Sequence, residues 1–200
     1  MSDIGDTSGT SNDSSGPKLQ GMASVYHPFS GEIHLFDQKG AELETPSKMA
    51  EIAPLLTRLN SLGGDLAVLK FSVWCAQSVA KPHPGGAEFV EAANRFLQRG
   101  SDRNELDDLY QEKCHVSMAA GTIGLKIGDP AAAGYLAAFA CLRPNYMMGA
   151  TSAASMLSLS YQLFHVRREE AGTTRALPAT RVAVNRLIIE LERRIDLLKS

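Results

Sequence analysis

The chain has 200 residues, a formal net charge of −2 and three cysteines. This length suits one domain, or one domain with a tail, and it can bury a core without disulfides or metals. The near-neutral charge argues against a general nucleic-acid-binding surface. The odd, scattered cysteines, Cys75, Cys114 and Cys141, indicate reduced thiols in the cytoplasm, and the first residues lack the pattern of a secretory signal.

The first 46 residues precede the predicted helical domain and fall into two parts. Residues 1–21 are mostly Ser, Gly, Asp and Thr, which predicts a disordered tail. In residues 22–46, weak alternation around Pro28–Gly31 fits either a short β-hairpin or an extended arm docked on the rest of the chain. Residues 47–200 are expected to form a single helical bundle domain.

Two helices are expected at the start of this domain. The first runs from Thr45–Pro46, a cap followed by proline, to Gly63–Gly64. Its apolar stripe consists of Met49, Ile52, Leu55, Leu56, Leu59 and Leu62. The second runs from Asp65 to about Lys81, with Leu66, Leu69, Val73 and Cys75 facing inward. Trp74 is predicted to anchor the core, because its side chain can bury a large area.

Two further helices follow a break at Pro82–Gly86. The pattern predicts one helix over 87–99, ended by Gly100, and another over 101–128 that begins with acidic residues. Gly121 and Gly124 lie inside the second of these. They leave two alternatives open: close approach of a neighbouring helix, or a break near residue 121.

The stretch 129–164 is the centre of the predicted bundle, an Ala-rich pair of helices. Asp129–Pro130 starts the first helix as a cap and a proline at the first position, and Pro144 stops it. The second begins at Tyr146 and carries no charge up to Phe164. Its length approaches a membrane span, but six polar side chains favour a helix buried in a soluble domain.

A polar loop is expected over 167–174, followed by a final helix from Pro178 to Leu198. A coiled-coil-like seam is formed by Val184, Ile188, Leu191, Ile195 and Leu198. Two interpretations stay open for this helix. It docks on its own domain, or it is the helix through which the protein binds a partner or a second copy of itself.

Catalytic and cofactor signatures are absent from the sequence. There is no phosphate-binding loop, HExxH or GxSxG motif, and we expect no cofactor and no metal. Cys114 and His115 are adjacent, but neighbours on a helix do not face each other. This adjacency alone does not indicate a catalytic pair. The alternative to a non-enzymatic protein is an enzyme with an unrecognised site near Cys114 and His115.

Charged residues suggest where a protein partner would bind. Asp107, Asp108 and Glu112 belong to the acidic opening of the fourth helix, and Arg186 and Arg193 lie on the last helix. The competing interpretation is a solvated face whose acidic residues stabilise the helix start. The sequence thus predicts a mainly α, compact bundle of about seven helices that acts as a cytoplasmic protein-binding module.

Three segments carry a resemblance to a known family: VWCAQSVA (73–80), EFVEAANRFLQRG (88–100) and GDPAAAGY (128–135). Their order resembles that of the helical immunity-type proteins of bacterial polymorphic toxin systems. This resemblance implies a non-enzymatic immunity or accessory role, with a toxin or another defence-system component as the partner. It implies no particular inhibitory residue.

Overall fold

The computed structural model describes residues 23–26, 33–36, 42–43, 51–100, 103–170 and 177–200. The predicted disordered tail, the predicted cap at Thr45–Pro46 and the first two residues of the helix predicted over 101–128 lie outside these residues. The described part is mainly helical. Its elements are α1 (Ile52–Gln77), the short 3₁₀ helix η2 (Pro84–Gly86), α2 (Ala87–Arg99), α3 (Asn104–Lys126), α4 (Pro130–Ala140), α5 (Tyr146–Glu170) and α6 (Leu177–Leu197).

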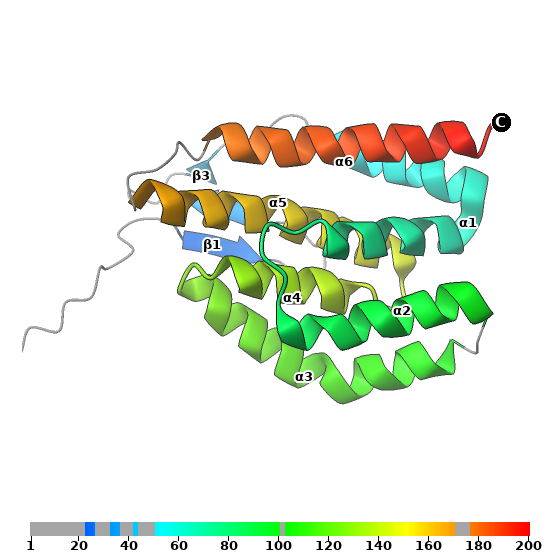
Figure 1. The fold of residues 1–200 in the computed structure, drawn as a ribbon, viewed down its shortest axis with the longest axis horizontal. Coiled ribbons are helices and arrows are strands. Elements are labelled where there is room, and N and C mark those ends of the chain that lie inside the picture. The colour runs from blue at the N-terminus through cyan, green and yellow to red at the C-terminus, as the bar shows by residue number, and fades with distance from the viewer. Residues whose placement is uncertain (1–22, 27–32, 37–41, 44–50, 101–102, 171–176) are drawn as a thin grey trace, which may run out of the picture.

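The helices pack side by side, with α4 and α5 at the centre (Figure 1). Helix α6 lies along one side of this pair and the α2–α3 hairpin along the other. Helix α1 contacts α2, α4, α5 and α6, and so joins the two sides. The predicted organisation around 129–164 is therefore the observed one, since the central pair touches nearly every other helix.

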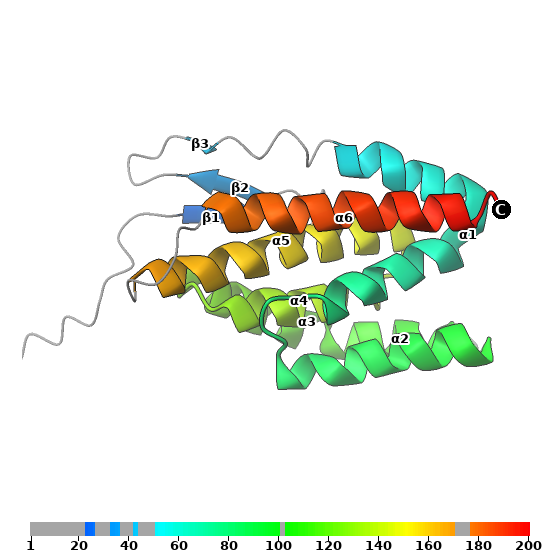
Figure 2. The ribbon, with the colours of Figure 1, turned by 45° about the horizontal axis from the view of Figure 1, so that its top comes forward.

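Six α-helices are described, and α1 contains two helical segments that meet at a kink, so the predicted boundary between the first two helices at Gly63–Gly64 is confirmed. The bend in α1 is at Gly64, whose φ of 64° and ψ of −170° are not helical. Glycine tolerates this conformation without the clash that a side chain would cause. Figure 2 shows the first half of α1 beside α6 before the chain turns back. Leu62 and Leu66, both predicted to face inward, flank the bend and are exposed.

Helix α1 ends at Gln77, four residues before the predicted end at Lys81. The N–H of Ala80 donates instead to Ser160 Oγ of α5, at 3.1 Å. Pro82 also disfavours a helical conformation in the residue before it. Trp74, predicted to be a core anchor, is only half-buried and stacks on the fully buried Phe71.

Several predicted helix ends are confirmed. Helix α2 spans Ala87–Arg99, and Gly100 after it has a left-handed φ of 58°. Asp129 Oδ1 accepts a hydrogen bond from the N–H of Ala131, and Pro130 occupies the first turn of α4. Helix α5 begins at Tyr146, as predicted from Pro144.

Glycines in α3 and α4 allow the central layer to pack closely. A Cβ atom on Gly121 would lie 2.4 Å from the Leu136 side chain, and one on Gly124 would lie 2.4 Å from Ala132. On α4, a Cβ atom on Gly134 would lie 2.5 Å from the carbonyl oxygen of Lys81. Helix α3 is continuous past Gly121, so the prediction of close approach is right and the alternative of a break is wrong.

Helix α5 continues to Glu170, whereas a loop was predicted from Arg167 onward. Arg and Glu are good helix formers, and polarity alone does not end a helix. None of the described helices is long and apolar enough to cross a membrane.

Helix α6 docks on its own domain, against α1 and α5. Its buried row consists of Ala183, Val184, Leu187, Leu191 and Ile195. The predicted seam is therefore corrected at two positions: Ile188 is only half-buried and Leu198 is exposed. Leu187 takes the place that the heptad pattern gave to Ile188.

Three short strands precede the helices: β1 (Ala23–Tyr26), β2 (Ile33–Phe36) and β3 (Glu42–Leu43). Strands β1 and β2 pair antiparallel, with Ala23 opposite Phe36, and β3 pairs with the other edge of β2. They lie within the segment where the sequence left a hairpin or an extended arm open.

Candidate protein-binding surfaces

Two of the three acidic residues predicted on α3, Asp107 and Glu112, take part in ion pairs within the domain. Asp107 Oδ1 accepts a hydrogen bond from Arg103 Nε at 2.8 Å. Glu112 pairs with its neighbour Lys113 at 2.7 Å, and both Glu112 and Asp108 are exposed. Asp107 therefore stabilises the protein's own structure, whereas Asp108 and Glu112 project into solvent.

The two predicted arginines lie on a different side of the molecule. Arg193 makes a two-pronged contact with Glu190, from Nε at 2.8 Å and from Nη2 at 2.7 Å. Arg186 donates to the hydroxyl of Tyr161 on α5. Because α6 and α3 flank opposite sides of the central helices (Figure 1), the five predicted residues do not form one surface.

Glu190 is the centre of the charge cluster on α6. Arg193 and Arg194 both donate to its carboxylate, and only 12% of the Glu190 side chain is exposed. The hydrogen bond from Arg193, followed by the charge of Arg194, lowers the pKa of Glu190. These ion pairs stabilise successive turns of α6, and they leave little unpaired charge to which a partner could bind.

Arg103 has a structural role that the sequence did not reveal. Its Nη2 donates to the carbonyl oxygens of Leu142, at 2.9 Å, and Arg143, at 2.7 Å. Its guanidinium also lies over the Tyr146 ring, 4.5 Å from the centroid. Arg103 thus holds the turn between α4 and α5 against the start of α3. No local motif signals this contact, because its acceptors are about forty residues away.

Two of the three cysteines are buried inside the domain. Cys75 and Cys141 are buried, and burial raises both pKa values, that of Cys141 to about 12. These thiols stay protonated at neutral pH and are poor nucleophiles. Cys114 is half-buried and His115 beside it is exposed. Among the described residues, no three His, Cys, Asp or Glu side chains cluster in a way that would hold a metal ion.

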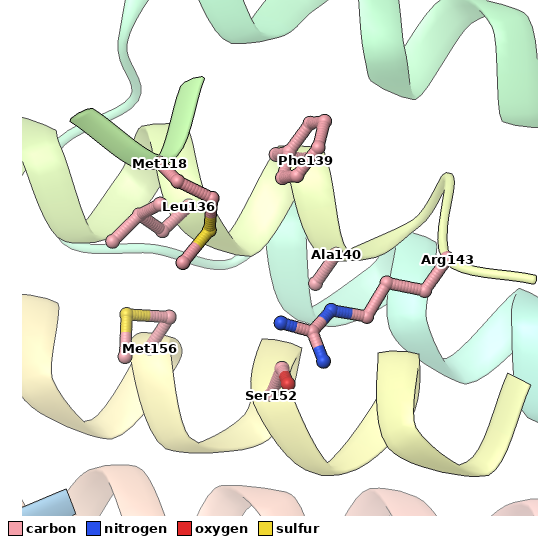
Figure 3. A pocket seen from close by; sticks show the side chains of 7 residues that line it. All are labelled: Met118, Leu136, Phe139, Ala140, Arg143, Ser152 and Met156. Atoms are coloured by element: carbon pink, nitrogen blue, oxygen red, sulfur yellow. The ribbon is translucent and has the colours of Figure 1, made fainter. Parts of the chain in front are cut away.

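A small, partly open cavity lies among α3, α4 and α5, with a volume of about 10 Å³. Figure 3 shows the Arg143 side chain reaching from the end of α4 toward Ser152, while Met118, Leu136 and Met156 line the other side. This volume is about what one water molecule needs. The cavity therefore has no room for an organic substrate.

A larger surface hollow, of about 280 Å³, lies among the end of α1, η2, α2 and α4. Its floor is made of small residues, including Gly86, Gly134 and Ala138. Its ionisable side chains are His83 and Glu91, both exposed, and His83 Nδ1 already accepts the N–H of Gly85. This is a shallow surface, without the buried polar groups that fix a substrate.

An exposed apolar row, which the sequence did not single out, runs along the second half of α3 and ends at Ile127, the residue that follows the last helical residue, Lys126. Val116 is 66% exposed, Ile123 64% and Ile127 59%, and Ala120 between them is also exposed. At 3.6 residues per turn these four positions fall within about 60° of one another around the helix. The spacings of four, three and four residues between these positions were the signal that the sequence offered.

No protein-family model, curated protein or solved structure matches this chain.

Proposed function

We propose that this protein is a non-enzymatic, cytoplasmic protein-binding module, and that the apolar row on α3 is its contact surface. The observation that carries the proposal is the alignment of Val116, Ile123 and Ile127, each more than half exposed, on one line of a helix. Isolated exposed apolar residues are ordinary, but an aligned group is typical of an interaction site.

The surroundings of the row support this assignment over an enzymatic one. Asp108 and Glu112 lie near its beginning and Lys126 near its end, which gives an apolar centre with a charged rim. Interfaces commonly have this composition. Of the two described cavities, the one beside the buried Arg143 and Ser152 is water-sized, and the larger hollow is shallow and lined mainly by small residues.

We place the protein in the cytoplasm because its three free cysteines fit a reducing compartment. An immunity or accessory role in a bacterial conflict system is the specific form that the family resemblance suggests. In that case the partner is a toxin or a component of the same defence system.

Affinity capture with matched variants tests the proposal. Ile123→Asp places a charge in the row, whereas Ile189→Asp places one on the exposed face of α6, at a residue that is 63% exposed. Wild type and I189D should recover the same protein from a native lysate, and I123D should lose at least 90% of it. Equal recovery by the two variants would contradict the assignment of the α3 surface.

A further inference from the structure

The surface hollow among α1, η2, α2 and α4 stays open because the residues of its floor have to be small. A Cβ atom on Gly134 would lie 2.5 Å from the carbonyl oxygen of Lys81, and one on Gly86 would lie 2.9 Å from the Cβ of Ala138. Ala138 belongs to the same floor. Close packing beneath the hollow therefore keeps long side chains out of its floor, and the domain does not fill the hollow itself.

Three side chains at the edge of the hollow can form hydrogen bonds and have no partner. Glu91 and Asn94 are three residues apart on α2 and so share a face of that helix, and Gln77 is the last residue of α1. Among the described residues, none of the three makes a hydrogen bond or an ion pair. Their oxygen atoms are available to accept hydrogen bonds from a group that enters the hollow.

His83 lies at the same edge in a fixed orientation. Its Nδ1 accepts the N–H of Gly85 at 3.1 Å, and its ring meets the Tyr135 ring edge-on, with 4.9 Å between the centroids. Because Nδ1 is the acceptor, the neutral ring carries its proton on Nε2. With His83 neutral, Glu91 is the one charged side chain among the residues that line the hollow.

The charge of Glu91 is not compensated within the domain. Of the cations near it in sequence, Arg95 is paired with Glu105 and Lys81 does not line the hollow. The end of α1 and the start of α2 both border the hollow (Figure 1). Their helix dipoles contribute partial charges of opposite sign, which offset each other. The carboxylate therefore determines that the hollow favours a cation.

The shape and the acceptors select one kind of cation. A guanidinium group is planar and has five N–H donors, so it can pair with the Glu91 carboxylate through two of them and with amide oxygens through others. An ammonium group has three donors and is more strongly hydrated. The volume of about 280 Å³ is at the lower limit for small-molecule sites, and arginine is enriched among the residues that anchor protein interfaces.

We infer that this hollow binds an arginine side chain of a partner protein, with the guanidinium on Glu91 and the aliphatic stem over the small residues of the floor. The inference rests on the proposed function only in taking the partner to be a protein, because the hollow is a different surface from the α3 row. A single arginine side chain at so shallow a site should bind weakly, with a Kd of roughly 1–10 mM.

Nuclear magnetic resonance of the ¹⁵N-labelled full-length chain, titrated with blocked amino acids, tests the inference. N-acetyl-arginine amide should shift the signals of Gln77, Glu91 and Asn94. The uncharged N-acetyl-citrulline amide should not shift them, and N-acetyl-lysine amide should bind at least threefold more weakly than the arginine probe. No shift at about 50 mM arginine probe would overturn the inference, as would equal binding of arginine and citrulline or of arginine and lysine.

Two charge-neutralising variants on α2 provide a matched comparison. Glu91→Gln should weaken binding of the arginine probe at least fivefold. Glu88→Gln removes the same charge at an exposed residue that does not line the hollow, and it should leave binding unchanged within twofold. Equal affinities of E91Q and E88Q would contradict the assignment of Glu91. Circular dichroism checks that both variants are folded.

Filling the hollow tests its shape without changing any charge. Ala87 is exposed and lines the hollow, so Ala87→Leu should abolish binding of the arginine probe. Ala119→Leu, at an exposed residue of α3, is the control and should bind the probe as wild type does. Full binding by A87L would place the arginine outside the hollow and overturn the inference.

A further arm separates a protein side chain from a free small molecule. Agmatine has the guanidinium but no peptide groups, and it should bind no more tightly than the blocked arginine. Agmatine binding tenfold tighter would identify a small molecule as the occupant and overturn the inference.

The two proposals fail separately. If the arginine probe does not bind but I123D still loses a captured protein, the binding function of the α3 row stands and the hollow has no part in it. If I123D captures the same proteins as I189D, the α3 assignment falls, while the titration still decides whether the hollow binds arginine.

Discussion

Helices α3 and α6 both carry apolar residues at spacings of three and four, yet one row is exposed and the other is buried. On α6, Val184, Leu187, Leu191 and Ile195 are covered by α1 and α5. On α3, the row at Val116 to Ile127 begins where α2 no longer runs alongside. The comparison teaches that heptad-like spacing identifies a surface that can bind a helix, while chain topology decides whether the domain itself supplies that helix.

The largest expected effect is on the buried row. Leu187→Ala should lower the free energy of unfolding by about 2–5 kcal/mol, because it removes a fully buried side chain and leaves a cavity. Ile123→Ala on α3 should change it by less than about 0.5 kcal/mol. Urea denaturation of the two variants measures the difference, and similar losses would mean that the α3 row is part of the core.

A second pair of variants compares the two faces of α3 at adjacent residues. Gly121→Val should destabilise by about 1–3 kcal/mol, because its side chain would overlap Leu136 of α4. Ala120→Val points into solvent and should stay within about 0.5 kcal/mol. Thermal and urea unfolding of both proteins would check this, and a neutral Gly121→Val would show that α4 shifts readily.

A third comparison concerns the ion pairs beside each row. Glu190→Gln should cost about 1–2 kcal/mol at neutral pH, because the shielded carboxylate accepts hydrogen bonds from two arginines. Glu112→Gln, at an exposed ion pair on α3, should cost less than about 0.5 kcal/mol.

The sign of the pH dependence follows from the lowered pKa of Glu190. The advantage of wild type over Glu190→Gln is fully present above the unfolded pKa of about 4.3 and is lost as the pH falls toward the native value. Urea denaturation of wild type and E190Q across this acidic range measures the loss. An advantage that persists at the lowest pH would contradict the electrostatic account.

Ile123→Asp should lower the free energy of unfolding by no more than about 1 kcal/mol, because the side chain is exposed and the cost comes from placing a carboxylate near the C-terminal end of α3. Its result is informative because the same substitution is expected to abolish capture of the partner. Chemical denaturation of the purified variant separates the two effects. A loss of several kcal/mol would show that Ile123 supports the fold and would weaken the binding argument.

Local signals in the sequence predicted much of the helical framework. Gly100, Asp129–Pro130 and Pro144 act on the few residues next to them, so their effects did not depend on the rest of the fold. The positions that were misjudged depend on distant neighbours. Leu66 and Ile123 have core-like spacing but no covering helix, and Arg103 bonds to carbonyl groups about forty residues away.

The candidate site was less predictable than the framework. Asp107 and Arg193 were selected for their charge, but each is engaged in an ion pair within the domain. The α3 row could not be recognised as exposed without knowing where α2 begins. The spacing of the row's residues was visible in the sequence, but the sequence did not show whether another helix would cover them.

The alanine-rich packing of α4 also affects which mutations the protein can accept. Ala131, Ala132, Ala133, Ala137, Ala138 and Ala140 are all buried. Only glycine is smaller than alanine, so nearly every substitution that arises by chance at these positions adds volume. Most substitutions at the buried alanines of α4 should therefore destabilise the protein by overpacking. Substitutions at the buried leucines of α6 should instead destabilise it by creating cavities. Natural divergence should consequently be slower along α4 than along the leucine positions of α6, where another large aliphatic side chain can substitute.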